Sequence, residues 1–137
     1  MEQYEIENLI EQAFNSLEYS YSPYSHFCVG ASLLTAEGKV FTGCNVENAS
    51  YGPSNCAERT AVFKAVSEGF QNFKAIAIVG GSFGKVEDYC PPCGVCRQVL
   101  SEFCRGDFTF ILARNKTEYK LYTLNELLPE RFDLEKK

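Results

Sequence analysis

Apolar residues near the start of the chain recur at steps of three and four, which is the spacing of one face of an α-helix. This pattern predicts a helix over residues 4 to 17. Its apolar face comprises Ile6, Leu9, Ile10, Ala13, Phe14 and Leu17. Pro23 and the serines around it then predict a loop over residues 19 to 25, because proline interrupts a helix and serine favours turns.

Two segments of alternating polarity follow this loop, residues 27 to 34 and residues 39 to 43, with Glu37-Gly38 between them. Alternation is typical of a half-buried strand and glycine favours a turn, so these segments predict a β-hairpin. Residues 44 to 55 are rich in asparagine, serine, glycine and proline, which predicts a long loop. Loops of this length usually carry a function.

Helices and strands alternate in the rest of the pattern. Small apolar residues predict a helix from Ala57 that is stopped by Gly69, and the apolar run over residues 75 to 79 predicts a strand covered on both faces. The remaining predicted elements are a helix over residues 93 to 103, strands over residues 108 to 113 and 119 to 122, and a short helix over residues 124 to 128. This order predicts an α/β fold, a three-layer α/β/α sandwich with a mixed five-stranded sheet, in a single domain over residues 1 to 137.

Composition and charge narrow the class of protein. Of the 137 residues, 45% are hydrophobic and 23% charged, as in soluble globular domains. The chain has neither a membrane-spanning apolar run nor the features of a secretory signal, so we expect a cytoplasmic protein, no membrane partner and seven reduced cysteines. A net charge of -5 with scattered basic residues disfavours a nucleic-acid partner and favours a small-molecule substrate.

Two cysteine-containing segments stand where helices are predicted to begin, NCAER at residues 55 to 59 and PCGVC at residues 92 to 96. Cys93 and Cys96 share a helix face, and a helix N-terminus lowers thiol pKa values, which favours the thiolates that zinc requires. Together with Cys56 they provide three ligands for a tetrahedral Zn²⁺. Three protein ligands leave the fourth position to water, which is the arrangement of a catalytic zinc site.

The residues beside Cys56 add to this prediction. In a regular helix Cys56 and Glu58 would lie roughly 200° apart around the axis, so Cys56 must stand at the non-helical entry if both face one ion. A carboxylate at Glu58 can then take a proton from a metal-activated water and deliver it again. Three thiolates on a dication leave a net negative charge, which Arg59 is expected to offset by hydrogen-bonding the ligand sulfurs.

Other interpretations of these residues remain open at this point. A CxxC pair also occurs in redox proteins, a lone Cys56 is more often a core thiol, and Glu58 alone suits any helix start. Cys90 and Cys93 form a second, overlapping pair, but Pro91 and Pro92 fix an extended approach, so we expect Cys90 to point away.

A structural zinc module that binds a protein partner is the alternative from another functional class. It would need a fourth ligand, and none of the candidates is paired with Cys56 at ligand spacing. The candidates are Cys28, Cys44, Cys90, Cys104 and His26. We expect Cys28, Cys44 and Cys104 to be core residues and His26 to lie in a loop.

Four segments together resemble the cytidine deaminases, namely SPYSHF at residues 22 to 27, GCNVENASY at 43 to 51, CAER at 56 to 59 and PCGVCRQ at 92 to 98. A ligand-x-Glu segment followed by Pro-Cys-x-x-Cys is the signature of zinc deaminases. The resemblance covers nearly the whole chain. It implies hydrolysis of cytidine and deoxycytidine to uridine and deoxyuridine with release of ammonia, in pyrimidine salvage, with zinc-bound hydroxide attacking C4 and Glu58 shuttling protons.

The resemblance also implies which residues bind the nucleoside. Residues that match Asn45 and Glu47 hold the ribose hydroxyls, and the residue that matches Phe27 packs against the base. The implied substrate-binding set is Phe27, Asn45, Val46, Glu47, Tyr51, Ala57 and Phe132. A buried Glu47 would accept hydrogen bonds from hydroxyls and repel phosphate, so we expect nucleosides to be preferred over nucleotides.

The three-cysteine type of this family is a homotetramer whose active sites use residues of neighbouring subunits. Tyr51 and Phe132 match such positions, so the resemblance implies a homotetramer here. Among enzymes, the alternatives are a deaminase of the nucleoside blasticidin and a deaminase of cytosine in single-stranded nucleic acid. The low basic charge disfavours the second.

Overall fold

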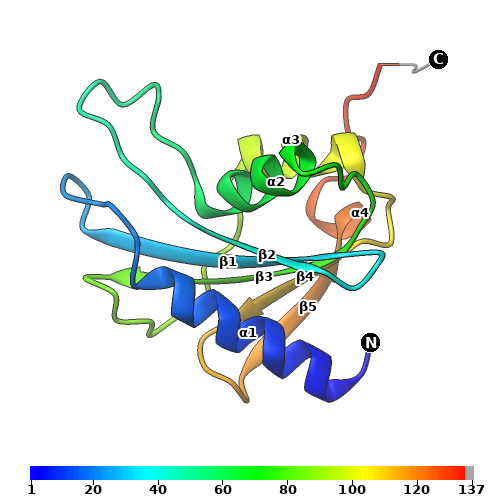
Figure 1. The fold of residues 1–137 in the computed structure, drawn as a ribbon, viewed down its shortest axis with the longest axis horizontal. Helices are drawn as coiled ribbons and strands as arrows, with labels where there is room; N and C mark the ends of the chain where they lie inside the picture. The colour runs from blue at the N-terminus through cyan, green and yellow to red at the C-terminus, as the bar shows by residue number, and fades with distance from the viewer. Residues whose placement is uncertain (135–137) are drawn as a thin grey trace.

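The computed structural model describes residues 1 to 134 and arranges them in three layers around one sheet (Figure 1). The elements are α1 (Gln3–Leu17), β1 (Phe27–Thr35), β2 (Val40–Cys44), α2 (Ala57–Ser67), β3 (Phe73–Ser82), α3 (Gly94–Phe103), β4 (Thr109–Ala113), β5 (Tyr119–Thr123) and α4 (Leu124–Leu127). Every predicted helix and strand is present, with ends shifted by a few residues at most. The periodicity of the sequence therefore predicted the elements correctly.

The five strands form one sheet in the order β2-β1-β3-β4-β5. β3 and β4 run parallel, whereas the other three neighbouring pairs are antiparallel. Parallel strands need a crossover connection, and α3 provides it between β3 and β4. The mixed five-stranded sheet is thereby confirmed.

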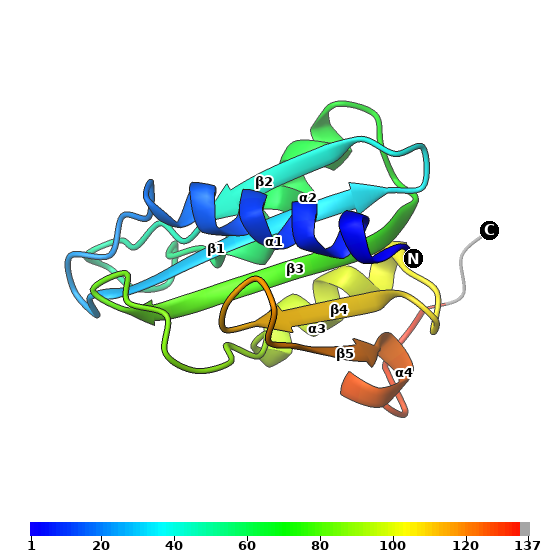
Figure 2. The same ribbon diagram turned by 90° about the horizontal axis from the view of Figure 1, so that it is seen from below.

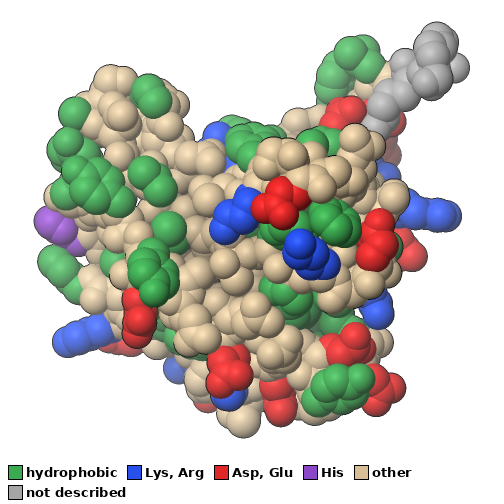
Figure 3. All heavy atoms as spheres, viewed as in Figure 1, with side chains coloured by type: hydrophobic (Ala, Val, Ile, Leu, Met, Phe, Trp, Pro, Cys, Tyr) green, Lys and Arg blue, Asp and Glu red, His purple; other side chains and the backbone are tan. Residues whose placement is uncertain are grey.

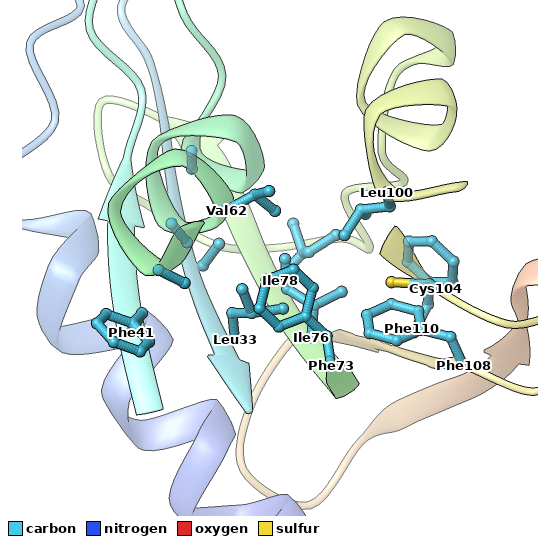
Figure 4. Close-up of a cluster of buried hydrophobic side chains, with 14 of the residues drawn as sticks. Leu33, Phe41, Val62, Phe73, Ile76, Ile78, Leu100, Cys104, Phe108 and Phe110 are labelled. Atoms are coloured by element: carbon cyan, nitrogen blue, oxygen red, sulfur yellow. The ribbon is translucent and has the colours of Figure 1, made fainter. Parts of the chain in front are cut away.

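The helices cover the two faces of this sheet unequally (Figure 2). α1 alone crosses one face, over β1 and β3, while α2 and α3 lie on the other. β3 is covered on both faces, as predicted: Ala75, Ala77 and Val79 pack in the cluster under α1, whereas Ile76 and Ile78 pack in the cluster under α2 and α3. Figure 4 shows this second, larger cluster, with Phe110 and Leu100 among its fully buried members.

A close contact at Gly43 fixes the position of α2 on the sheet. A Cβ atom at this residue would lie 2.4 Å from the Ala57 carbonyl oxygen and 2.6 Å from the Ala61 backbone nitrogen. The first turn of α2 therefore rests directly on the backbone of β2, which only glycine permits. Because Cys56 and Glu58 belong to this end of the helix, the contact also positions them.

Two of the three expected core cysteines are less buried than predicted. Cys104 lies in the core, but Cys28 and Cys44 are only half-buried. Their strand ends lie at the edge of the layers, where the covering helices stop. Within residues 1 to 134, none of the helices combines the length and apolar character needed to cross a membrane.

Candidate metal centre and active site

The N-termini of α2 and α3 bring three cysteines together. Cys56 is the N-cap of α2 and Cys93 the N-cap of α3, and both have extended backbone conformations. Cys56 therefore stands at the non-helical entry, as the spacing to Glu58 required. The Sγ atoms of Cys56 and Cys93 lie 3.7 Å apart, those of Cys93 and Cys96 lie 3.5 Å apart, and all three lie within 4.8 Å of one another.

This geometry fits a tetrahedral zinc ion. Sulfur ligands at about 2.3 Å in a tetrahedral arrangement lie about 3.8 Å from one another. The thiols of Cys56, Cys93 and Cys96 have nearly this spacing, and they are the only group of potential metal ligands that clusters in this way within the described part of the chain. Cys90 is not a member of the cluster, as the two prolines after it predicted.

Hydrogen bonds stabilise negative charge on the sulfurs. Arg59 Nη2 donates to Cys56 Sγ at 3.1 Å, as expected from the sequence, and the Cys96 backbone nitrogen donates to Cys93 Sγ at 3.4 Å. A hydrogen bond from the Cys96 thiol, with further bonds from Arg59 and Cys93, lowers the pKa of Cys56 to about 5 despite its burial. Arg59 Nε is buried and has no hydrogen-bond partner among the described residues.

Glu58 is the buried acid of the site. Its side chain lies in the first turn of α2, and the residue is only 4% exposed. Burial raises the pKa of Glu58 to about 7, and the neighbouring Cys56 thiolate adds to this increase. A carboxyl group with a pKa near neutrality can both hold and release a proton at working pH, which general acid-base catalysis requires.

A cleft of about 340 Å³ opens over these residues. It is lined by Val29, Asn45, Glu47, Ser54, Asn55, Cys56, Ala57, Glu58, Arg59, Cys90, Pro91 and Cys93. Burial raises the pKa of the Cys90 thiol to about 12, which keeps it neutral. Its sulfur lies over Gly80, where a Cβ atom would be 2.8 Å from Cys90 Sγ and 3.1 Å from the Phe27 ring. Cys90 and Phe27 therefore lie against the same backbone position.

Asn45 directly follows β2, and both the nitrogen and the oxygen of its side-chain amide form hydrogen bonds. Its Nδ2 donates to the Phe27 carbonyl oxygen at 2.7 Å, and its Oδ1 accepts from the Val29 backbone nitrogen at 2.9 Å and from the Ser20 hydroxyl. A side-chain amide has two N–H donors. One donor of Asn45 therefore has no partner among these contacts.

Glu47 is held by the loop before β1. Its Oε1 accepts from the backbone nitrogens of Tyr24 and Ser25 at 3.0 and 3.1 Å, and its Oε2 accepts from the Ser25 hydroxyl. These bonds, with that from the Ser25 hydroxyl the strongest, lower the pKa of Glu47 and keep it ionised. The prediction that Glu47 is buried is wrong, because the loop leaves its side chain half-exposed.

Comparison with known proteins identifies the family. The family profile for the cytidine and deoxycytidylate deaminase zinc-binding region matches residues 3 to 112. The chain belongs to this family.

Relatives of the deaminase resemble it over nearly their whole length. A cytidine deaminase from Sporosarcina psychrophila is 46% identical over 131 residues, which cover 96% of this chain and 93% of the relative. One from Halalkalibacterium halodurans is 48% identical over 127 residues, 93% of each chain. The crystal structure of a cytidine deaminase from Burkholderia pseudomallei is 46% identical, with a TM-score of 0.82 over 91% of this chain and 97% of that one. The resemblance seen in the sequence is confirmed.

Four predicted substrate residues of this deaminase, Phe27, Val46, Tyr51 and Phe132, do not line the cleft of the single chain. Phe27 is exposed and lines a separate cavity of about 240 Å³, together with Gly80 and Tyr89. Val46 is exposed, and its backbone pairs with those of Tyr21 and Asn55, which holds the loop on both sides. Tyr51 is 72% exposed and lines a neighbouring cavity, also of about 340 Å³, that shares Glu47 with the cleft. Phe132 is 67% exposed on the C-terminal segment, where its carbonyl accepts from Gln98.

Sequence reasoning missed several residues that line the cleft. Val29 and Asn55 carried no chemical signal, and Cys90 was considered only as a metal ligand, although its neutral thiol forms part of the wall. Ser25 was also missed, although it holds Glu47. One local signal existed, since a serine two residues before Phe27 favours a turn in which the hydroxyl accepts from the Phe27 N–H.

Proposed function

We propose that this deaminase hydrolyses cytidine and deoxycytidine to uridine and deoxyuridine with release of ammonia. The observation that carries the proposal is the juxtaposition of a three-thiol metal centre and the buried Glu58 in one open cleft. Relatives named as cytidine deaminases, at 46 to 48% identity over most of the chain, support the substrate class. A structural zinc module needs neither an open cleft nor a buried acid beside the metal ligands.

Cys56, Cys93 and Cys96 would hold the zinc ion. When bound, zinc supplies Lewis-acid chemistry that lowers the pKa of water and makes hydroxide available near neutral pH. Arg59 contributes by donating a hydrogen bond to a ligand sulfur, which offsets part of the negative charge of three thiolates. The neutral Cys90 thiol adds no further charge to the site.

Glu58 moves the protons of the reaction. In its ionised form it accepts a proton from the attacking water, and it then delivers a proton to N3 of the pyrimidine. Ionised again, it accepts the proton of the new hydroxyl at C4 and passes it to the departing amino group, so that ammonia leaves and a carbonyl remains. Burial of Glu58 favours this role, because a pKa near 7 lets one group serve as base and acid in turn.

Asn45 and Glu47 recognise the sugar. An ionised carboxylate has about four acceptor positions, and three of those of Glu47 are occupied by the loop. One N–H donor of Asn45 has no partner among the contacts of the described residues. A sugar hydroxyl both donates and accepts, so it can satisfy Glu47 and Asn45 together, while a phosphate would be repelled by the carboxylate.

The base would lie between the metal centre and an apolar wall. Phe27 does not line the cleft of the single chain, but its ring lies over Gly80 beside the cleft residue Cys90 and would pack against the base from there. The fully buried Ala57, which lines the cleft at the start of α2, would form the floor. An apolar wall with few polar groups is typical of sites that bind small planar ligands.

Exposed aromatic residues favour a homotetramer. Hydrophobic side chains gather on the loops that project beside the cleft (Figure 3). They are Tyr19, Tyr21, Tyr24, Val46 and Tyr51. Large exposed apolar patches mark interaction surfaces, and a second copy of the chain would cover these loops and bring Tyr51 or Phe132 to a neighbouring cleft.

Subunit exchange tests this assembly. Light scattering after gel filtration should give a molar mass four times that of one chain. If Phe132 completes the cleft of another subunit, the separately inactive Glu58→Gln and Phe132→Ala chains should regain activity when they are dissociated, mixed and reassembled. A monomer in solution would contradict the tetramer, and no recovery in the mixture would contradict the exchange of Phe132.

The proposed reaction is tested by following the loss of cytidine absorbance with purified enzyme. Treatment with a chelator should abolish turnover, and adding zinc back should restore it. The Glu58→Gln variant should retain zinc, but its kcat should be at least about a thousandfold lower than that of the wild type. Glu68→Gln is the matched control, because Glu68 is exposed at the far end of α2. Cytidine monophosphate should react much more slowly than cytidine.

Other outcomes would favour the alternatives. If the wild type binds zinc but does not turn over cytidine or deoxycytidine, the structural module gains support. Turnover of blasticidin in preference to cytidine would indicate the other nucleoside deaminase. Equal rates with cytidine and its monophosphate would contradict the role given to Glu47.

A further inference from the structure

The Ser25 hydroxyl connects two parts of the site that are far apart in sequence. Ser25 Oγ accepts a hydrogen bond from the Phe27 backbone nitrogen at 3.0 Å and donates to Glu47 Oε2. Phe27 begins β1, whereas Glu47 lies in the loop after β2. One hydroxyl therefore bridges the start of a strand and the carboxylate proposed to bind the sugar.

The direction of this hydrogen-bond chain is fixed. The Phe27 N–H has no acceptor capacity, so the Ser25 oxygen must accept from it. The single hydroxyl proton of Ser25 then points to Glu47, whose ionised carboxylate can only accept. Because Ser25 has no second proton to donate, it does not provide a donor to the substrate.

The Phe27 end of the chain is held independently of Ser25. Its carbonyl accepts from Asn45, and Phe27 pairs with Ser82 in the β1–β3 ladder. His26, between Ser25 and Phe27, has a φ of 60° and accepts at its carbonyl from the Phe83 backbone nitrogen at 2.6 Å. This part of the backbone is thus anchored to the end of β3 and to Asn45, which follows β2.

The Glu47 end depends much more on Ser25. Among residues 1 to 134, the carboxylate has hydrogen bonds apart from that of the Ser25 hydroxyl only at Oε1, from the backbone nitrogens of Tyr24 and Ser25, and its side chain is half-exposed. Oε2 therefore has Ser25 as its protein partner. Without that bond the carboxylate gains freedom to rotate.

We propose that Ser25 is a positioning residue that transmits the fixed geometry of the start of β1 to the Glu47 carboxylate and so sets its orientation toward a sugar hydroxyl. This proposal rests on the proposed function, in which Glu47 accepts that hydroxyl. Its consequence is a defect confined to recognition of the sugar, because the metal centre, Glu58 and Phe27 keep their own contacts.

The experiment compares cytidine with 2′,3′-dideoxycytidine, which lacks the hydroxyls in question. Ser25→Ala should raise KM for cytidine about tenfold with kcat within about twofold of wild type, the effect expected from the loss of one hydrogen bond to a charged group. For dideoxycytidine it should change KM by less than about twofold. Ser25→Thr, which keeps the hydroxyl at an exposed position, should restore the wild-type KM.

A double-mutant cycle and a control complete the test. Glu47→Gln alone should impair cytidine more than dideoxycytidine, and adding Ser25→Ala to it should cause no further loss. Ser67→Ala, which removes a hydroxyl bonded to the Lys64 carbonyl at the end of α2, should behave as wild type.

Each contrary result has a separate meaning. If Ser25→Ala impairs both nucleosides equally, or if its effect adds fully to that of Glu47→Gln, Ser25 has only a structural role and the proposal is overturned. If Glu47→Gln leaves KM for cytidine unchanged while turnover continues, the sugar-binding role of Glu47 fails instead.

Discussion

Replacing Gly43 by alanine tests whether the metal centre depends on the direct contact between β2 and α2. The added Cβ atom would meet the Ala57 carbonyl oxygen at 2.4 Å and the Ala61 nitrogen at 2.6 Å, and both are backbone atoms that cannot rotate away. Ordinary contact begins near 3.4 Å. The first turn of α2 must therefore move by about 1 Å away from the sheet.

The size of the effect follows from this displacement. Overpacking in a close-packed interior costs about 1 to 3 kcal/mol of the free energy of unfolding, which corresponds to a fall in Tm of about 3 to 10 °C for a chain of this size. A shift of about 1 Å in a catalytic group can lower the rate about a hundredfold. Because Cys56 and Glu58 move with α2 while Cys93 and Cys96 stay with α3, we also expect weaker zinc retention.

Gly38→Ala is the matched control for this prediction. Gly38 lies in the turn between β1 and β2 with a φ of 97° and no atom within 4 Å of an added Cβ. Alanine there introduces about 1 to 2 kcal/mol of backbone strain but no displacement of α2. Thermal unfolding, zinc content and kcat/KM separate the two variants. If Gly43→Ala loses only stability, as Gly38→Ala should, the link between this contact and the metal centre is refuted.

Three further predictions concern the centre itself and the core. Arg59→Ala should lower zinc affinity about 10- to 100-fold, measured by competition with a chelator, and unchanged affinity and turnover would remove Arg59 from the site. Cys96→Ser should lose zinc on dialysis whereas Cys90→Ser should retain it, and the opposite pattern would show that the wrong pair of cysteines has been chosen. Leu100→Ala, at a fully buried position, should cost about 2 to 5 kcal/mol in chemical denaturation, and a loss below 1 kcal/mol would contradict the packing of α3 on the sheet.

The helices and strands could be predicted from the sequence because the patterns that indicate them lie within short segments of the chain. The stripe from Ile6 to Leu17 and the apolar run of β3 report which faces are buried, and turn residues mark the element ends. The order of the strands in the sheet is a property of contacts between distant segments, and it was not predicted. Two of the cysteines also differed from prediction, since the half-burial of Cys28 and Cys44 depends on where the covering helices stop.

The metal cluster was predictable for a particular chemical reason. Cys93 and Cys96 are close in sequence and share a helical turn, and the spacing of Cys56 to Glu58 required a non-helical entry, which the extended N-cap confirms. The pKa of Glu58 was not predictable, because it follows from burial under the assembled layers.

The sequence by itself therefore determined the elements and predicted the metal ligands and the acid-base residue, because each element and each of the two cysteine segments depends on residues within a few positions of one another. That Cys56 meets Cys93 across 37 positions was decided only by the tertiary structure. Only the tertiary structure decided how Ser25 holds Glu47 across 22 positions and how Gly43 seats α2. It also showed that Tyr51 and Phe132 lie outside the cleft of their own chain. Such contacts arise where separate segments meet in space, and no local pattern records them.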